Sequence, residues 1–555
     1  MDRIYRNYQP IPIPDFVCID ISTKSVYIKG TKVDGKSNPK RTTIGKLVDE
    51  KTMHPNDNFK SLYPKLWNKY YNKRPDTLYS GLFLLIWFKI YSSDLYKLLI
   101  KNTNIDLTNF ILDLAMYIIK FRDNTFDLFS ERMSDTLLFS GKVYSGSEIS
   151  TRLKSISLDM INGFKIDWMK KFFNGKKIKV SISVAGSNND SYDINSLLAE
   201  KDHSKSGKHS KIISYVWILD AETSDPIAYF VVNGSVPDCK SFDIVLSFLK
   251  DNNAQIEAFI MDHNYCNHSV ISSLNKTNND YLIMMPSGTL GTSEMIKEYK
   301  DKIVRIENII NEEGLLGVSK FSKLFYARND TGYINLYYCE KNASKGKQIE
   351  YKKIYKEIKR INEEILNGNN NITVNKDFQD FIKITKDKQI EYDEEKYMDE
   401  INKKGFYSIV SSKDYGPKAV HQMYHLWNSS EVGYDIIKNE LGCDAKRTYK
   451  DPSILSKFFV CFISTIIVNE IRKLSIKLNI PTNGFIETLN NIFFILKTNN
   501  EYDLFKDSNT AEILFKHLNI NNNFLRFFKE EINDNLSNNK ENKFWKNPLD
   551  IVNLD

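Results

Sequence analysis

The spacing of apolar residues divides the chain into extended and helical regions. Short alternating runs between residues 16 and 47 predict a small sheet, because a two-residue period places apolar side chains on one face of a strand. From Leu78 to Phe173 the period becomes helical. From Lys177 onward, three apolar strands precede a helix-like segment, the strand IEAFIMD and the strand DYLIMMP. The pattern predicts a mixed α/β domain behind a helical region.

Size and composition narrow the class of protein. A chain of 555 residues can form two or three domains with ample buried core, and 77 Lys and Arg against 70 Asp and Glu give a formal charge of +7. This mild basic excess permits a nucleic-acid partner without requiring one. The six cysteines have no paired spacing, which indicates a reducing cytoplasm. The apolar runs at 81–87 and 458–468 are shorter than the ~20 residues of a membrane span, so we expect no membrane segment.

One C-terminal stretch, MYHLWNSSEVGYDIIKNEL at 423–441, groups four chemically distinct side chains. Tyr424, Trp427, Glu431 and Lys438 follow one another at intervals of three, four and seven residues, which returns each to nearly one helix face. An amphipathic helix with a solvated edge explains the same pattern. The spacing also resembles the Tyr-x2-Arg-x3-Glu-x6-Lys signature of DDE-type insertion-sequence transposases, with Trp427 at the arginine position.

Three upstream segments extend this resemblance. The lead-in PKRTTIGKLVDEKTMHPND resembles the basic strand and Pro-Asn turn of such transposases. Asp262 ends an apolar strand, where an open α/β sheet places its chemistry, and DHNYCN keeps the aspartate and aromatic residue of the family's Asp-Arg-Gly motif. The turn NGSVPD resembles the family's Pro-Gly-Asn-x-x-Asp turn, with Asp238 expected to act as a cap.

The first acidic position departs from the family. The loop LLAEKDHSKSGKHSKI matches the family's basic segment, yet the strand before it reads KVSIS. The alignment places Ser181 at the position of the first aspartate and Ser183 at that of the threonine. A serine hydroxyl is a poor ligand for Mg2+, so the resemblance implies a site that lacks one carboxylate.

The resemblance implies a ribonuclease-H-like fold, and the order of strands and helices agrees with it. It implies that Asp262 and Glu431 are catalytic residues that bind Mg2+ or Mn2+, supported by Tyr424, Trp427 and Lys438. The implied partners are double-stranded DNA, both the terminal inverted repeats and the target, and a second copy of the chain in a synaptic dimer. The implied location is the cytoplasm, in association with the nucleoid.

Basic residues outside this site are candidates for DNA binding. Lys205, Lys208 and Lys211 lie in a basic loop, and Arg152 and Lys154 lie on a helix for which Ser147 is a plausible N-cap. A solvated loop and a plain helical bundle are the competing interpretations. A zinc site is an alternative interpretation of one short segment, although the spacing of its possible ligands fits no common zinc finger. These ligands would be Asp262, His263, Cys266 and His268.

The resemblance divides the chain into six expected regions. They are a small β region at 1–75, a helical, DNA-binding region at 76–174, the first part of the core at 175–290, a β-rich insertion with a charged helix at 291–403, the last core strand and the Glu431 helix at 404–475, and a helical tail at 476–555. Two functions remain open at this point. One is an active transposase that cleaves and joins DNA, and the other is a catalytically inactive descendant that only binds DNA.

Overall fold

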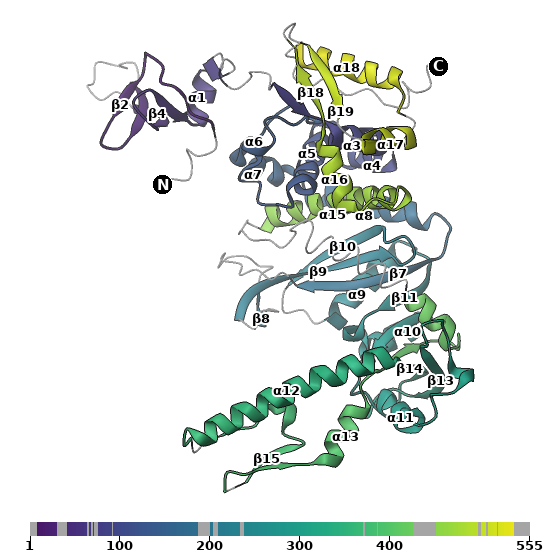
Figure 1. The fold of residues 1–555 in the computed structure, drawn as a ribbon. Helices are drawn as coiled ribbons and strands as arrows, with labels where there is room; N and C mark the ends of the chain where they lie inside the picture. The colour runs from purple at the N-terminus through teal and green to yellow at the C-terminus, as the bar shows by residue number, and fades with distance from the viewer. Residues whose placement is uncertain are drawn as a thin grey trace.

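The fold was analysed in a computed structural model (Figure 1). It describes residues 8–29, 41–63, 66–67, 70, 76–91, 93–186, 200–203, 209–233, 238–369, 372–385, 387–425, 451–497, 501–506, 509–518 and 520–537.

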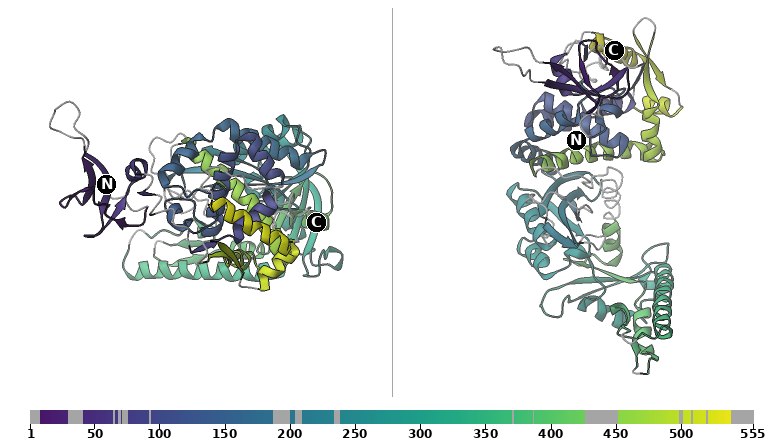
Figure 2. Two further views of the ribbon diagram at one scale, coloured as in Figure 1. Left: turned by 90° about the horizontal axis from the view of Figure 1, so that it is seen from above. Right: turned by 90° about the vertical axis from the view of Figure 1, so that its left-hand side faces the viewer.

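The N-terminal residues form a separate small sheet, which stands to one side of the rest of the chain (Figure 2). Its strands are β1 (Ile11–Pro12), β2 (Cys18–Asp20), β3 (Ser25–Lys29), β4 (Arg41–Leu47) and β5 (Thr52–Pro55), in the order β1-β5-β4-β3-β2. Helix α1 (Asp57–Leu62) covers it, and Phe59 and Val26 are fully buried in its own small core. This unit can therefore bury apolar surface without the main domain.

A bundle of helices follows. Its members are α3 (Gly81–Ile90), α4 (Asp94–Asn102), α5 (Ile105–Phe121), α6 (Phe129–Arg132), α7 (Gly146–Ser155) and α8 (Leu158–Phe173). Helix α5 is buried along nearly its whole length, which its apolar composition requires. Asp113 on α5 is a buried carboxylate that accepts hydrogen bonds from the backbone N–H groups of Phe139 and Ser140, at 2.6 and 3.1 Å. It fixes the turn after α6 against the bundle.

The largest element is one mixed sheet, which has nine strands in the described residues. The order is β10-β9-β7-β11-β12-β17-β14-β13, with β8 paired to β9. Strands β7, β11 and β12 are parallel and every other pair is antiparallel. Their bounds are β7 (Ile178–Gly186), β8 (Glu200–His203), β9 (His209–Asp220), β10 (Pro226–Asn233), β11 (Ile256–Met261), β12 (Tyr281–Met285), β13 (Leu316–Lys323), β14 (Thr331–Tyr338) and β17 (Phe406–Ser411). An antiparallel edge on a parallel centre is consistent with the expected ribonuclease-H-like fold.

Helices cover both faces of the sheet. One face packs on α9 (Asp238–Asp251), α10 (His268–Lys276) and α11 (Leu290–Tyr299), through residues that include Val180, Ile182 and Met261. The alternate residues, including Ile260, point to the other face, where they pack on the helical residues 417–425. The short 3-10 turns η1 (His263–Tyr265), η2 (Ile306–Asn308) and η3 (Lys376–Phe378) lie in the connections.

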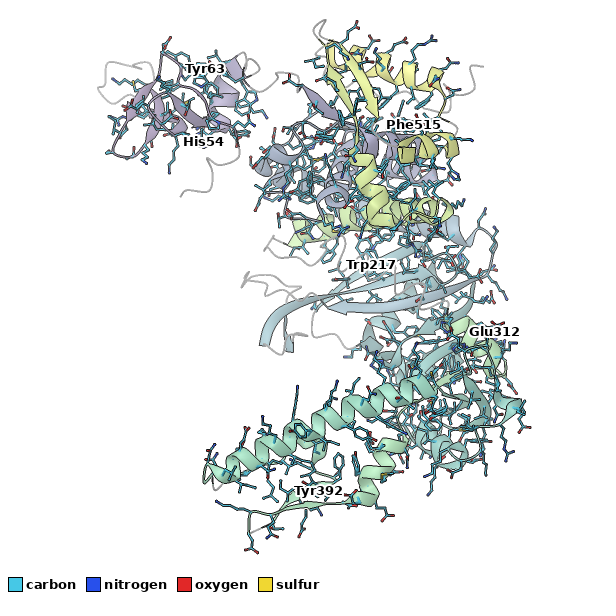
Figure 3. All side chains as sticks on the ribbon, viewed as in Figure 1. His54, Tyr63, Trp217, Glu312, Tyr392 and Phe515 are labelled. Atoms are coloured by element: carbon cyan, nitrogen blue, oxygen red, sulfur yellow. The ribbon has the colours of Figure 1, made fainter. Side chains whose placement is uncertain are left out.

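Helix α15 (Asp451–Lys477) joins the sheet to the helical bundle. Its Phe462 lies 5.7 and 5.0 Å, between ring centroids, from Trp217 on β9 and Tyr229 on β10. Its Phe459 lies 5.3 Å from Phe164 on α8. Figure 3 labels Trp217 in this layer between sheet and bundle.

Helix α15 is longer than the uninterrupted apolar run at 458–468 within it. Its residues 453–477 are long and apolar enough to cross a membrane, and the most apolar 18-residue window has a mean hydropathy of 1.8. However, 89% of its most apolar window is buried inside the protein. The apolar composition is thus accounted for by the core that α15 fills.

The segment 291–403, expected to be β-rich, contains more helix than strand. Strands β13 and β14 extend the main sheet, and the charged helix α12 (Glu340–Leu366) runs outward from it (Figure 1). Strands β15 (Ile382–Ile384) and β16 (Ile390–Tyr392) and helix α13 (Glu394–Asn402) return alongside α12. Ile361 and Phe381 anchor a small core between α12 and this returning segment.

The C-terminal segment was expected to be a helical tail, and the structure corrects this. It contains α16 (Thr482–Asn490), β18 (Ile492–Leu496), β19 (Tyr502–Lys506), α17 (Asn509–His517) and α18 (Asn522–Ser537). Strand β18 pairs with β6 (Thr77–Tyr79), more than 400 residues earlier in the chain. A Cβ added to Gly81 would lie 2.1 Å from the carbonyl oxygen of Leu489, so glycine permits this close approach. The segment completes the helical bundle.

We expect Phe462→Ala to lower the stability of the protein markedly. Removing a fully buried phenylalanine leaves a cavity between sheet and bundle, which costs about 3–5 kcal/mol. Ile476→Ala on the same helix is the control, because the Ile476 side chain is 66% exposed. Thermal unfolding should show a fall of several degrees for the first variant and little change for the second. Equal melting temperatures would contradict the role assigned to α15.

Candidate functional site

Asp262 lies at the carboxyl end of β11, immediately after the central parallel strands. Its carboxylate caps the 3-10 turn η1: Oδ1 accepts from the backbone N–H of Asn264 at 3.0 Å, and Oδ2 accepts from the Asn264 side-chain amide at 3.3 Å. The side chain is half-buried. Asp262 therefore has a structural role as a cap, and this role also fixes its carboxylate at the sheet edge.

Ser181 lies on the neighbouring parallel strand, on the same face of the sheet as Ile260. The register pairs Ser181 with Ile260 and Ile182 with Met261. Ser181 is thus two residues, or about 7 Å, back along the sheet from the level of Asp262. Its side chain is fully buried. Ser181 is therefore on the strand next to β11 and on the same face of the sheet, set back from Asp262, and it supplies no carboxylate.

The helical residues 417–425 cross the sheet at this edge. Tyr424 is buried, and its hydroxyl donates a hydrogen bond of 3.2 Å to the carbonyl oxygen of Met261, the residue before Asp262. Val420, one turn earlier, packs against the same face of the sheet. Trp427, Glu431 and Lys438 lie outside the described residues, and so their positions relative to Asp262 stay predictions.

Two histidines on the same helical segment lie near the candidate site and were not among the residues predicted from the sequence. His421 and His425 are one turn apart, with ring centroids separated by 4.3 Å, and His421 also lies 5.5 Å from the ring of Tyr337. Burial and, second, the neighbouring His425 lower the pKa of His421 to about 4, and Glu313 partly opposes them. The i, i+4 spacing in HQMYH was the available signal, since it places both rings on one face.

The zinc interpretation does not hold for the described residues. Cys266 is buried, and burial raises the pKa of its thiol to about 12, whereas zinc binds the thiolate. His268 instead pairs with Asp330, at 2.7 Å. Within the described parts of the chain, no group of three His, Cys, Asp or Glu residues could hold a metal ion.

The same finding bears on the expected divalent ion. Transposase DDE domains generally use such ions, and Asp262 is a suitable oxygen ligand. Within the described residues Asp262 belongs to no group of three or more such ligands, and its oxygens are hydrogen-bonded to Asn264. These residues alone therefore do not make up a two-ion site.

The candidate DNA-binding residues have different surroundings. Arg152 forms an ion pair with Asp106, and its guanidinium lies 4.9 Å from the ring centroid of Phe110, so it is held within the bundle. Lys154 is exposed. Lys205 and Lys208 lie outside the described residues, as does the side chain of Lys211 on β9.

The cap of the helix that carries Arg152 also differs from the expectation. Ser145, not Ser147, is the N-cap of α7, and its hydroxyl exchanges hydrogen bonds with Glu148 in a capping box. Ser147 instead donates a hydrogen bond of 3.1 Å to Asp57 on α1. This contact and the Lys60–Glu148 ion pair attach the N-terminal unit to the bundle.

Comparison with known families agrees with the topology. Residues 191–467, just under half of the chain, match the family described as transposase DDE domain. This part of the chain is therefore similar to transposase DDE domains. The insertion-sequence type and the Tyr-Arg-Glu-Lys subgroup are finer assignments that this match does not decide.

Two further comparisons add little to this assignment. No curated protein matches the chain significantly. One solved structure that matches is described as a cryo-EM structure of the piggyBac transposase synaptic complex with hairpin DNA. It is 13% identical, covers 84% of this chain and 86% of that chain, and has a TM-score of 0.35. A TM-score of this size does not establish a common fold.

We expect stability to fall between pH 6.5 and pH 4 in part because of His421. The folded state favours the neutral ring, whose pKa is about 4, while the unfolded chain binds a proton near pH 6.5. The stabilisation is therefore complete above pH 6.5 and is lost as the pH falls toward 4. His421→Gln should show a shallower decline in melting temperature over this range. His517→Gln, at an exposed position, should decline as the wild type does.

Proposed function

We propose that this chain is the DNA transposase of an insertion sequence, which binds the terminal inverted repeats of its element as a dimer. In this proposal it cleaves the strand ends and joins the 3′-hydroxyls to target DNA with Mg2+ or Mn2+. Asp262 and Glu431 hold the ion, with Tyr424, Trp427 and Lys438 supporting the helix that carries Glu431. The transposase DDE domain at 191–467 is the observation that carries the proposal.

One contact in the structure supports the proposed pairing of Asp262 with Glu431. The hydrogen bond from Tyr424 to Met261 fixes a helical segment at the strand end, one residue before Asp262. Glu431 follows Tyr424 by seven residues, or about two helical turns, which would return it to the same helix face. A continued helix would bring the two carboxylates to one edge of the sheet.

A second function follows from Ser181. Its hydroxyl is buried, and if Ser181 aligns with the family's first carboxylate, the site has one fewer negative charge with which to bind a divalent ion. This observation favours a catalytically inactive, transposase-derived protein that binds element ends without cleaving them. The two functions predict different outcomes in one strand-transfer assay.

Asp262→Asn and Glu431→Gln should each abolish metal-dependent cleavage of the element's own ends. Asn can still accept the Asn264 backbone hydrogen bond, so the turn should remain while the charge is lost. The melting temperature of Asp262→Asn should therefore stay close to that of the wild type. Binding of the ends, followed by gel shift, should persist in both variants. Wild-type protein that binds ends and never cleaves them would support the inactive alternative.

Restoring the missing carboxylate tests the alignment of β7. Ser181→Asp buries an unpaired charge, so the variant should melt below the wild type in EDTA. It should regain stability with Mg2+ or Mn2+ because an ion would bind the new carboxylate, and calorimetry should show tighter metal binding. Ser408→Asp is the matched control, since Ser408 is fully buried on the opposite face of the sheet, bonded to Thr292. It should be destabilised without metal rescue. Unchanged metal binding in Ser181→Asp would refute the alignment.

A further inference from the structure

Five lysines form a single stripe along α12. They are Lys341, Lys345, Lys352, Lys356 and Lys359, and every one of them is exposed. With about 100° between successive residues, their directions fall within a sector of about 60°. From the first to the last, 18 residues rise about 27 Å along the helix axis. We call this set the lysine stripe.

The stripe lies opposite the buried face of α12. Ala343 and Ile361 are fully buried, and their directions are about 170° from the centre of the stripe. Ala343 packs against the chain at Gly405, and Glu350 forms an ion pair of 3.4 Å with Lys404. These contacts hold the first half of α12 against the chain just before β17. They fix the direction in which the stripe faces relative to the main sheet. Side chains stand off α12 on the side turned away from β15 and β16 (Figure 3).

Four of the five lysines of the stripe have no acidic partner in the part of the chain that the structure describes. Among the described residues, Lys341, Lys345, Lys352 and Lys356 form no ion pair, and Lys359 is 3.8 Å from Glu363, where the stripe ends. Two other acidic residues of α12, Glu357 and Glu364, form ion pairs with Arg360, which lies outside the stripe. A solvated helix face ordinarily mixes both signs of charge, because opposite charges four residues apart stabilise a helix. Along the five turns of the stripe, only Lys359 has such an oppositely charged partner within the described chain.

Aromatic and apolar side chains flank the lysines. Tyr355 is 70% exposed and lies within about 60° of three stripe lysines, and Ile349 and Tyr351 are about half exposed. Exposed tyrosines beside unpaired lysines suit a nucleic-acid surface, where phosphate contacts supply the affinity. A lysine is a mobile point charge, so such a stripe suits binding without sequence selection.

We propose that the lysine stripe is a contact surface for the phosphate backbone of duplex DNA, independent of base sequence. Its length of about 27 Å corresponds to about eight base pairs. This inference rests on the proposed function, and it names where on the molecule the DNA duplex is held. Helix α12 leaves the main sheet at β14, so the stripe extends the DNA-binding surface outward from the strands that carry the candidate site.

The test compares two double variants of α12 with equal loss of charge. Lys352→Ala with Lys356→Ala removes two members of the stripe, whereas Lys347→Ala with Lys353→Ala removes two lysines that lie outside its sector. Binding to a 30-base-pair duplex of unrelated sequence is measured by fluorescence anisotropy over a range of salt concentrations. Circular dichroism checks that both variants remain folded.

For the stripe variant, the plot of log K against log salt concentration should be shallower by about 2. Its affinity for the duplex at low salt should be at least about tenfold weaker than that of the wild type. The control should lose less than half as much. Equal slopes in the two variants would overturn the proposal. Polyglutamate, an anion without phosphate, serves as a second ligand. A stripe variant that loses binding to polyglutamate and keeps its binding to duplex DNA would also overturn it.

Cleavage of the element's ends, assayed in parallel, separates this inference from the proposed function. Suppose the wild type cleaves the ends and the stripe variant keeps the salt dependence of the wild type. This result would refute the role of the lysine stripe and leave the proposed function standing. A wild type that binds no duplex at all would refute both.

Discussion

The burial of α15 between the sheet and the helical bundle is the interaction on which the rest of the main structure depends. Phe462 packs against Trp217 and Tyr229 of the sheet, and Phe459 packs against Phe164 of the bundle. If α15 were removed, the sheet and the bundle would each expose apolar surface to water. This exposure costs about 25 cal/mol for each Å2. This layer holds the sheet in place, and the sheet positions Asp262 and Ser181.

Periodicity was sufficient to predict the centre of the fold. The strands before and after Asp262 are short continuous apolar runs, which is what burial on both faces requires, and they occur as parallel neighbours. The same signal failed for the C-terminal segment, because β18 and β19 are brief and their partner β6 lies more than 400 residues away. Pairing over such a distance leaves no local pattern in either strand.

The candidate site shows a similar division. Spacing placed Tyr424 on one helix face, and the structure gives its hydroxyl a partner in the last residue of β11. Spacing could not show that Arg152 is held by Asp106, since that ion pair joins two helices. Nor could it show that Cys266 is inert through burial. Partners distant in sequence decide whether a charged or nucleophilic side chain is available for chemistry.

The pairing of β6 with β18 has a consequence for synthesis of the chain on the ribosome. The helices that follow β6 are translated first, and the strand and helices that close their core follow more than 400 residues later. Through most of elongation this half-built bundle exposes apolar surface, a state prone to aggregate or to be held by a chaperone. A premature stop codon before residue 492 would yield a product whose helical bundle cannot close, even with all of the residues 191–467 that match the family present.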